Sequence, residues 1–274
     1  MAYVFHFIAD HPSRRGDLKG LASALNQMPM NTFLDSAITA LHLITSFDPG
    51  LWTVALRSLG VSATACLIGC AVGISLGAWL GVSKFAGRGV LLTLLNTLLA
   101  LPSVVVGLVI YLLLSRTGPL GFLGWLFSFK AMVMAQVVLV VPVAAALTRQ
   151  LVEDAELAHG EQWRSLGADN AVRCLLLAWH ERFALLTVVV ACFGRAISEV
   201  GAVMIVGGNI EGFTRVMTTA IALETSKGDL PLALALGLIL LGIVGCLNVM
   251  LSVFRHWQTQ YQQSHQNSLR GWVA

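Results

Sequence analysis

Long apolar runs separated by short polar turns dominate the pattern of residues along this chain. Windows of 18 to 27 residues without a charged side chain occur at 58–83, 89–115, 131–148 and 230–254. A membrane-spanning helix needs about 20 consecutive apolar residues. The runs do not alternate between apolar and polar at every second position, so they favour helices over the strands of a membrane barrel. The pattern predicts an all-α integral membrane protein.

Five core transmembrane helices follow from this pattern when a fourth, charge-interrupted run is included. We expect them at about 51–82, 90–114, 131–147, 183–206 and 232–253. Pro102 and Pro142 lie inside two of these runs. Interior prolines are tolerated in membrane helices because neighbouring groups satisfy the freed backbone atoms. We therefore expect both spans to continue through their proline.

The segment 31–47 leaves the number of spans open. Asp35 and His42 interrupt its apolar positions, so it is either an interfacial helix or a sixth, amino-terminal span. Residues 1–30 are polar and show no period. We expect them to be a dispensable amino-terminal extension, reflecting a start site placed upstream of Met28 or Met30.

Composition supports the membrane assignment and narrows the function. Apolar residues make up 57% of the 274 positions and charged residues only 11%, against about 25% charged residues in soluble domains. The composition therefore excludes a soluble enzyme. A net charge of +3 is too small to indicate a nucleic-acid-binding surface. The five cysteines include no C-x-x-C pair, and we expect small buried thiols rather than a disulfide or metal framework.

The distribution of Lys and Arg predicts the topology, because cytoplasmic loops carry the excess of positive charge. With five spans, the turn at 84–88, the polar interval 149–182 and the tail 255–274 share one side. That side holds eight Lys and Arg residues, and the loops of the other side hold four. The interval 149–182 and the tail are therefore predicted to be cytoplasmic.

Glycines in the first core span form a regular ladder. Gly73 to Gly77 matches the G-x-S-x-G elbow of serine hydrolases, but that motif requires a strand-turn-helix context. Here it lies within a continuous apolar run, and Gly69, Gly73, Gly77 and Gly81 recur at every fourth position. Such spacing leaves one helix face as bare backbone and allows close contact with another helix. We predict packing rather than catalysis.

Other catalytic signatures are missing from the sequence. No lysine follows a glycine, as the phosphate-binding P-loop requires, and there is no H-E-x-x-H. We therefore expect neither an ATP site of that kind, nor a resident metal, nor a catalytic residue on this chain.

Ionisable residues inside the fourth span are the strongest intramembrane candidates. Arg195 and Glu199 are four residues apart and share a helix face. They form either a structural ion pair or a pore-facing arginine that meets an anion in the translocation path. Glu199 would cancel much of the arginine's field, which favours the ion pair. Gly207, Gly208 and Asn209 then form either a plain turn, which we favour, or an anion-binding nest of backbone N–H groups.

The segment from Glu161 to Ala168 resembles the cytoplasmic signature of ATP-binding-cassette (ABC) importer permeases. Glu161 and Gly167 have the family's spacing, while Gln162 and Trp163 replace its two alanines, and His180 stands where the family often has proline. The runs at 195–202 and 207–210 resemble the permeases of oxyanion importers for molybdate, sulfate and tungstate. Three further runs, at 101–108, 214–221 and 224–229, resemble the tungstate permeases in particular. The whole resemblance covers about residues 31–254.

This resemblance implies a type I ABC importer permease fold, with 31–254 as the transmembrane permease domain. It implies a homodimer in a bacterial cytoplasmic membrane, two cytoplasmic ATPases that bind ATP and Mg, an external substrate-binding protein and no cofactor on this chain. Tungstate is the expected cargo, with molybdate or sulfate and thiosulfate as alternatives. An ion-coupled secondary transporter would show repeats with broken helices in matching positions, and an intramembrane enzyme would need paired catalytic groups.

The signature segment has the properties of a docking helix. Trp163 and Leu166 are three residues apart and share a face that Glu161 and Arg164 flank. Tryptophan is favoured at interface hot spots, and Gly167 suits the left-handed residue that ends a helix. We expect these five residues to couple the chain to its ATPase. The alternative is a solvated loop with Trp163 resting on the bilayer surface.

Overall fold

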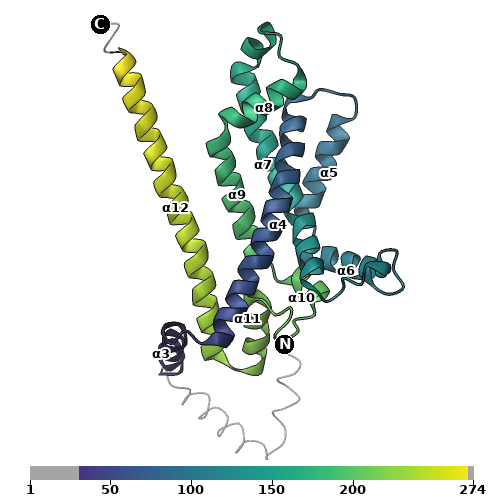
Figure 1. Ribbon diagram of the computed structural model, residues 1–274, viewed down its shortest axis with the longest axis vertical. Coiled ribbons are helices and arrows are strands. Elements are labelled where there is room, and N and C mark those ends of the chain that lie inside the picture. Colours follow the sequence, from purple (N-terminus) through teal and green to yellow (C-terminus); the bar gives the residue numbers. More distant parts are fainter. Residues whose placement is uncertain (1–30, 271–274) are drawn as a thin grey trace, which may run out of the picture.

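The computed structural model describes residues 31–270, with side chains described for 36–158 and 160–253, and the expected extension 1–30 lies outside these residues. Every regular element in the described range is helical (Figure 1). In chain order these are α3 (Asn31–Thr45), α4 (Pro49–Val82), α5 (Arg88–Ala100), α6 (Ser103–Leu114), the 3-10 turn η2 (Gly121–Leu123), α7 (Phe129–Ser165), α8 (Asn170–His180), α9 (Arg182–Ile197), α10 (Gly201–Gly207), α11 (Met217–Lys227) and α12 (Leu230–Arg270).

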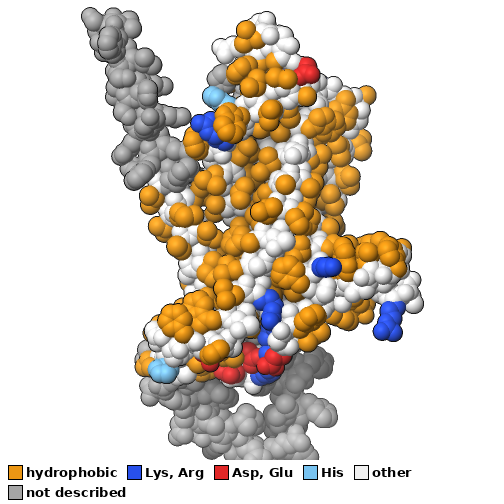
Figure 2. All heavy atoms as spheres, in the orientation of Figure 1, with side chains coloured by type: hydrophobic (Ala, Val, Ile, Leu, Met, Phe, Trp, Pro, Cys, Tyr) orange, Lys and Arg blue, Asp and Glu red, His pale blue; other side chains and the backbone are white. Residues whose placement is uncertain are grey.

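The described helices give three to five membrane spans. Those at Pro49–Val82, Phe129–Ala158 and Leu230–Val253 are long and apolar enough to cross alone. The pairs α5–α6 and α8–α9 are bent by 99° and 77°, and they bring the total to five if each counts as one span. Figure 2 shows hydrophobic side chains over most of the visible face, with most of the visible acidic ones gathered at its lower end. This confirms the all-α membrane class.

The prediction of one continuous second span is wrong, because the chain turns sharply at Pro102. α5 ends at Ala100, Leu101 is extended with ψ 130°, and α6 starts after Pro102. The residue before a proline is driven out of the helical region, and proline cannot donate a backbone hydrogen bond. As a result α6 lies across the direction of the other long helices (Figure 1). Pro142, by contrast, lies within a continuous α7, as predicted.

The third and fourth predicted spans also differ from the structure. α7 does not end near residue 147 but continues as one helix to Ser165. The fourth span is discontinuous, since α9 ends at Ile197 and α10 begins at Gly201. Glu199 therefore lies in a helix break rather than in the middle of a helix. The backbone of α12 likewise remains helical through most of the predicted polar tail.

The short helix α3 favours the interfacial alternative for the first segment. Its 15 residues correspond to about 22 Å of helix, less than the roughly 30 Å of a bilayer core. It lies beside the start of α12, where Ala40 joins a buried cluster with Leu236 (Figure 1).

The glycine ladder packs directly against α7, as predicted. A Cβ on Gly73 would lie 2.5 Å from Ala144 Cβ, and one on Gly77 only 2.4 Å from the Ala145 carbonyl oxygen. We call the α4 face formed by Gly69, Gly73, Gly77 and Gly81 the glycine seam. All four of its glycines would clash with α7 if they carried a Cβ.

Ion pairs fasten the same two helices to α5 at the cytoplasmic end. Glu153 of α7 accepts from Arg149 at 2.6 Å and also from Arg88 at the start of α5. Arg88 Nε also donates to the Leu80 carbonyl of α4 at 3.2 Å. Arg88 thereby connects the start of α5 to Glu153 of α7 and to the end of α4.

The cysteines are free thiols, as predicted. Cys66, Cys70 and Cys192 are buried in one cluster, and Cys174 is partly buried. Cys246 is exposed, so the expectation of burial is wrong for this residue. Its helix α12 is only 22% buried over its apolar window, which leaves much of its surface uncovered by the described residues.

The glycine seam predicts a position-specific cost for adding one methyl group. Gly77→Ala forces a Cβ against the α7 backbone and should destabilise the folded protein by about 1–3 kcal/mol. Gly242→Ala in α12 is the control, because a Cβ there meets nothing within 4 Å. Thermal unfolding of the detergent-purified protein measures the difference. Equal melting temperatures for both variants would contradict the close α4–α7 contact.

Candidate functional site

The end of α7 lies with α8 at one end of the molecule, far from α11, and this is the end predicted to be cytoplasmic (Figure 1). We call residues 158–167 the coupling segment. Gly167 has φ +79°, its N–H donates to the Arg164 carbonyl, and the Ala168 N–H donates to the Trp163 carbonyl. These two bonds form a Schellman motif, in which a left-handed residue ends the helix. The predicted role of Gly167 as a helix terminator is confirmed. The segment is not a short separate helix, however, but the last turns of α7.

The two apolar residues of the coupling segment face different surroundings. Trp163 is partly buried against a cluster that includes Ala78, Val152 and Leu177. Leu166 is 76% exposed. The prediction that the two side chains share one docking face is therefore not met, since one packs inward and the other is exposed. Leu166 is therefore the apolar side chain that the segment leaves exposed, while Trp163 packs against its own subunit.

Charged residues brace the coupling segment from one side. Glu156 is almost fully buried and accepts from Arg164 at 2.7 Å and from Arg173 of α8. Asp169 accepts from the Val172 N–H at 2.8 Å and caps α8. Glu161 is exposed. Arg164 is thus held by an intramolecular carboxylate, and Glu161 remains open to solvent.

The intramembrane pair Arg195 and Glu199 is in direct contact. Arg195 Nη1 lies 2.6 Å from Glu199 Oε2. The side chain of Glu199 is only 3% exposed, whereas that of Arg195 is 43% exposed. Glu199 Oε1 also accepts from the Ala202 N–H at 3.3 Å, in the first turn of α10. The structural ion pair is present, and the Arg195 side chain remains partly exposed.

Two neighbouring helices hold this break in place. Gln136 of α7 donates through Nε2 to the Ala196 carbonyl at 2.9 Å. Thr218 of α11 donates through Oγ1 to the Glu199 carbonyl at 2.8 Å. The Ala196 carbonyl lies in the last turn of α9 and the Glu199 carbonyl in the break that follows, where regular helical hydrogen bonds end. The backbone carbonyls at this break therefore accept hydrogen bonds from Gln136 and Thr218. The sequence analysis did not identify these two residues, because each lies more than 15 positions from the carbonyl that it contacts.

The residues 207–209 form a packed turn. Gly208 and Asn209 both have positive φ, at +69° and +51°. A Cβ on Gly207 would lie 2.8 Å from Met132 Sδ, and Asn209 Nδ2 donates to the Thr219 carbonyl at 3.3 Å. The turn alternative is therefore the one that the structure supports, and it anchors α10 to α7 and α11.

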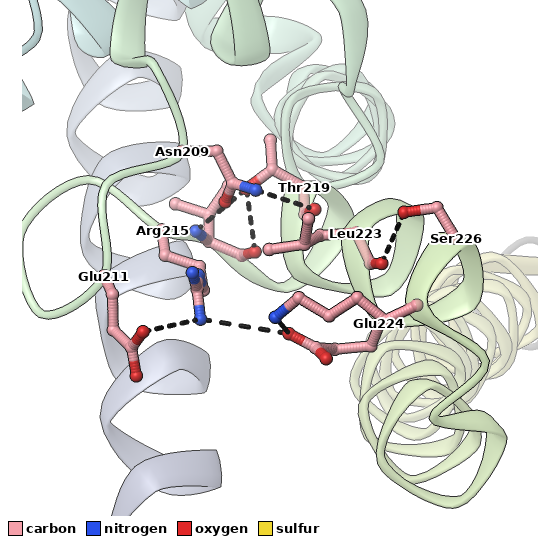
Figure 3. Close-up of polar contacts among 9 residues, drawn as sticks. Asn209, Glu211, Arg215, Thr219, Leu223, Glu224 and Ser226 are labelled. Carbon is pink, nitrogen blue, oxygen red and sulfur yellow. Dashed lines mark hydrogen bonds and ion pairs between the residues drawn. The ribbon is translucent and has the colours of Figure 1, made fainter.

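An outer polar cluster lies at the end opposite the coupling segment, and sequence reasoning missed it. Figure 3 shows Arg215 between two carboxylates, 3.5 Å from Glu211 Oε2 and 3.9 Å from Glu224 Oε1. Lys227 reaches the same Glu224 oxygen at 3.0 Å. The i,i+4 spacing of Glu211 and Arg215 and the i,i+3 spacing of Glu224 and Lys227 were the available signals. Arg57 of α4 adds a bond to the Gly212 carbonyl at 2.8 Å.

These features suit binding and conformational coupling rather than covalent chemistry. The described residues contain no group of His, Cys, Asp and Glu side chains that could hold a metal ion. The serine of the G-x-S-x-G match, Ser75, donates to the Ala71 carbonyl of its own helix at 2.8 Å. It therefore has the geometry of an ordinary helical serine.

No family model matches the chain. Several curated proteins are similar to it, and three of them follow. The tungstate uptake system permease protein TupB of Peptoclostridium acidaminophilum is 44% identical over 77% of this chain and 93% of its own length. A probable anion ABC transporter permease protein of Haloferax volcanii is 38% identical over 72% and 88%. The molybdenum transport system permease protein ModB of Escherichia coli (strain K12) is 32% identical over 65% and 82%.

The alignments cover 82–93% of the length of these relatives, and the described helices include three to five candidate membrane spans. The chain therefore belongs to the oxyanion permease family of ABC importers and is a multi-pass membrane protein.

Proposed function

We propose that this chain is the membrane permease of a tungstate importer. The observation that carries the proposal is the 44% identity to a tungstate uptake permease across 93% of that relative, against 32% to a molybdenum permease. As a permease the chain is a transport component without enzymatic activity or cofactor, and ATP is hydrolysed by an ATPase partner. The alternative cargoes are molybdate, sulfate and thiosulfate, since all are oxyanions of charge −2.

Residues 31–254 are proposed as the complete permease domain, and a homodimer as its working form. α6 supports the homodimer because it extends away from the rest of the subunit and leaves Val104, Leu108 and Leu112 at least half exposed (Figure 1). A second copy would cover this apolar face.

The mass of the purified complex should correspond to two permeases with two ATPases, and a complex with a single permease would contradict the dimer.

The coupling segment is proposed to dock in a groove of the ATPase, with Leu166 as its apolar anchor and Glu161 beside it. Helix-in-groove docking uses an apolar residue on a rigid helix end, and the Glu156 ion pairs with Trp163 packing provide that rigidity. α7 then links the ATPase to the ion-pair break, because Gln136 on the same helix bonds the carbonyl beside Arg195.

The outward-facing part of Arg195 is proposed to lie along the translocation path. Its guanidinium keeps donors exposed while Glu199 holds one of them. A fully unpaired arginine would retain a dianion too strongly for release, whereas a half-neutralised one offers a weak, transient contact. The turn of Gly207, Gly208 and Asn209 is proposed to support this region structurally.

Cargo selection is tested by uptake in a strain that lacks the chromosomal transporter. Cells that carry this permease with its cognate ATPase and binding protein should accumulate tungsten, and unlabelled tungstate should suppress that uptake at lower concentration than molybdate or sulfate. The measurement is cellular metal content by mass spectrometry. Preferential molybdenum or sulfate uptake would contradict the tungstate assignment and leave the permease assignment standing.

Substitutions in the coupling segment should separate docking from folding. Leu166→Ala removes an exposed anchor and should weaken ATPase association by about 2 kcal/mol if it is a hot spot, without lowering the melting temperature. Gly167→Val should also weaken the coupling between the permease and its ATPase, because a branched side chain disfavours the left-handed φ of +79°. Trp163→Ala should instead destabilise the subunit itself, since Trp163 packs on a buried cluster.

Leu175→Ala on α8 is the matched control, because Leu175 is 73% exposed but lies outside the coupling segment. Co-purification of the ATPase and ATP turnover stimulated by the loaded binding protein are the measurements. Normal association and turnover in both Leu166→Ala and Gly167→Val would show that another element couples the two subunits.

Because Arg195 and Glu199 interact, the stability losses caused by substituting each of them should not be additive. Arg195→Gln strands the buried Glu199 carboxylate and should cost about 3 kcal/mol or more. Glu199→Gln should cost less, because Arg195 is partly exposed. The double variant should lose less than the sum of the two single losses, and Ser198→Ala in the same break should be nearly neutral. Thermal unfolding measures all four, and a strictly additive double variant would show that the charges do not interact.

A further inference from the structure

A cavity of about 390 Å³ opens between α4 and α7. Its α7 wall uses Lys130, Val133, Met134 and Val137, which recur at the three- and four-residue spacing of one helix face. Seven residues of helix correspond to about 10 Å, so the cavity is a groove that follows the helix axis. It is completed by Thr64 and Ile68 of α4 and by Trp125 and Phe129.

The lining of the groove is almost wholly apolar, and its one charged residue, the exposed Lys130, stands at one end. Lys130 Nζ lies 5.4 Å from the centre of the Trp125 ring, at the start of α7. The coupling segment ends the same helix on the cytoplasmic side, so this start lies at the outer membrane surface. Trp and Lys are typical of that depth. From there the groove descends along Val133 and Val137 toward the bilayer core.

Charge at the outer end is positive and unopposed within the groove. None of the eight lining residues is acidic. The first helical hydrogen bond of α7 runs from the Met132 N–H to the Ser128 carbonyl. The N–H groups before it have no partner within the helix and carry the partial positive charge of a helix start. The Ser128 hydroxyl donates to the Trp125 carbonyl. This end therefore attracts an anion, while the rest of the groove attracts hydrocarbon.

We propose that this groove binds an anionic phospholipid of the outer leaflet, with the headgroup phosphate at Lys130 and one acyl chain along Ile68, Val133 and Met134. A transported oxyanion has no apolar part to fill the groove. The lining itself offers no carboxylate to pair with Lys130, and a lipid phosphate supplies that negative charge. The proposal is independent of the cargo assigned above.

Lipid binding to the purified permease–ATPase complex tests this proposal. Native mass spectrometry is performed in detergent micelles that contain either phosphatidylglycerol or zwitterionic phosphatidylcholine. Lys130→Gln should weaken phosphatidylglycerol binding about five-fold, as one lysine at a membrane surface contributes about 1 kcal/mol, and should leave phosphatidylcholine binding unchanged. Val133→Trp should fill the groove and lower the binding of both lipids.

Lys84→Gln is the matched control, because Lys84 is an exposed lysine at the opposite, cytoplasmic end. If Lys130→Gln and Lys84→Gln lose phosphatidylglycerol to the same extent, the site is overturned. Equal affinity of the unsubstituted complex for the two lipids would overturn it as well. Cross-linking of Met134→Cys between two permease chains would show that a second copy, rather than a lipid, covers the groove.

Discussion

The close approach of α4 and α7 along the glycine seam is the contact on which the rest of the structure depends. At Gly73 and Gly77 the α4 backbone lies where any Cβ would meet α7 atoms within 2.5 Å. Apolar burial does not by itself hold helices together in lipid, so small residues that permit dense packing must do so. The same contact supports α7 through Pro142, because Val141 and Ala144 on either side of that proline pack against Gly73.

The uninterrupted helix α7 connects the candidate functional parts of the molecule. Its first turns line the groove proposed to bind lipid, Gln136 bonds the end of α9 beside Arg195, and its last turns form the coupling segment. If the proposed ATPase contact displaces that segment, the displacement would reach the helix break through α7. The break can respond because it is held by a few polar contacts rather than by a regular helix.

The sequence was informative where a feature depends on neighbouring residues. The long spans, the glycine seam, the Arg195–Glu199 contact and the left-handed Gly167 were all predicted from local spacing. The bend at Pro102 and the break after Ile197 were not, because apolar content is the same on both sides of each. The inward packing of Trp163 and the outer polar cluster depend on contacts between distant segments, which periodicity does not encode.

Distances between spin labels in the assembled transporter test most directly whether α4 and α7 move together and carry the coupling motion. Labels replace exposed Leu67 of α4 and Val138 of α7, with Cys246 changed to serine. On trapping the ATP-bound state, this distance should stay constant to within about 1–2 Å, the size of ordinary helix shifts, while a label at Leu166 moves relative to the partner subunit. An α4–α7 distance that changes as much as the Leu166 distance would contradict the account.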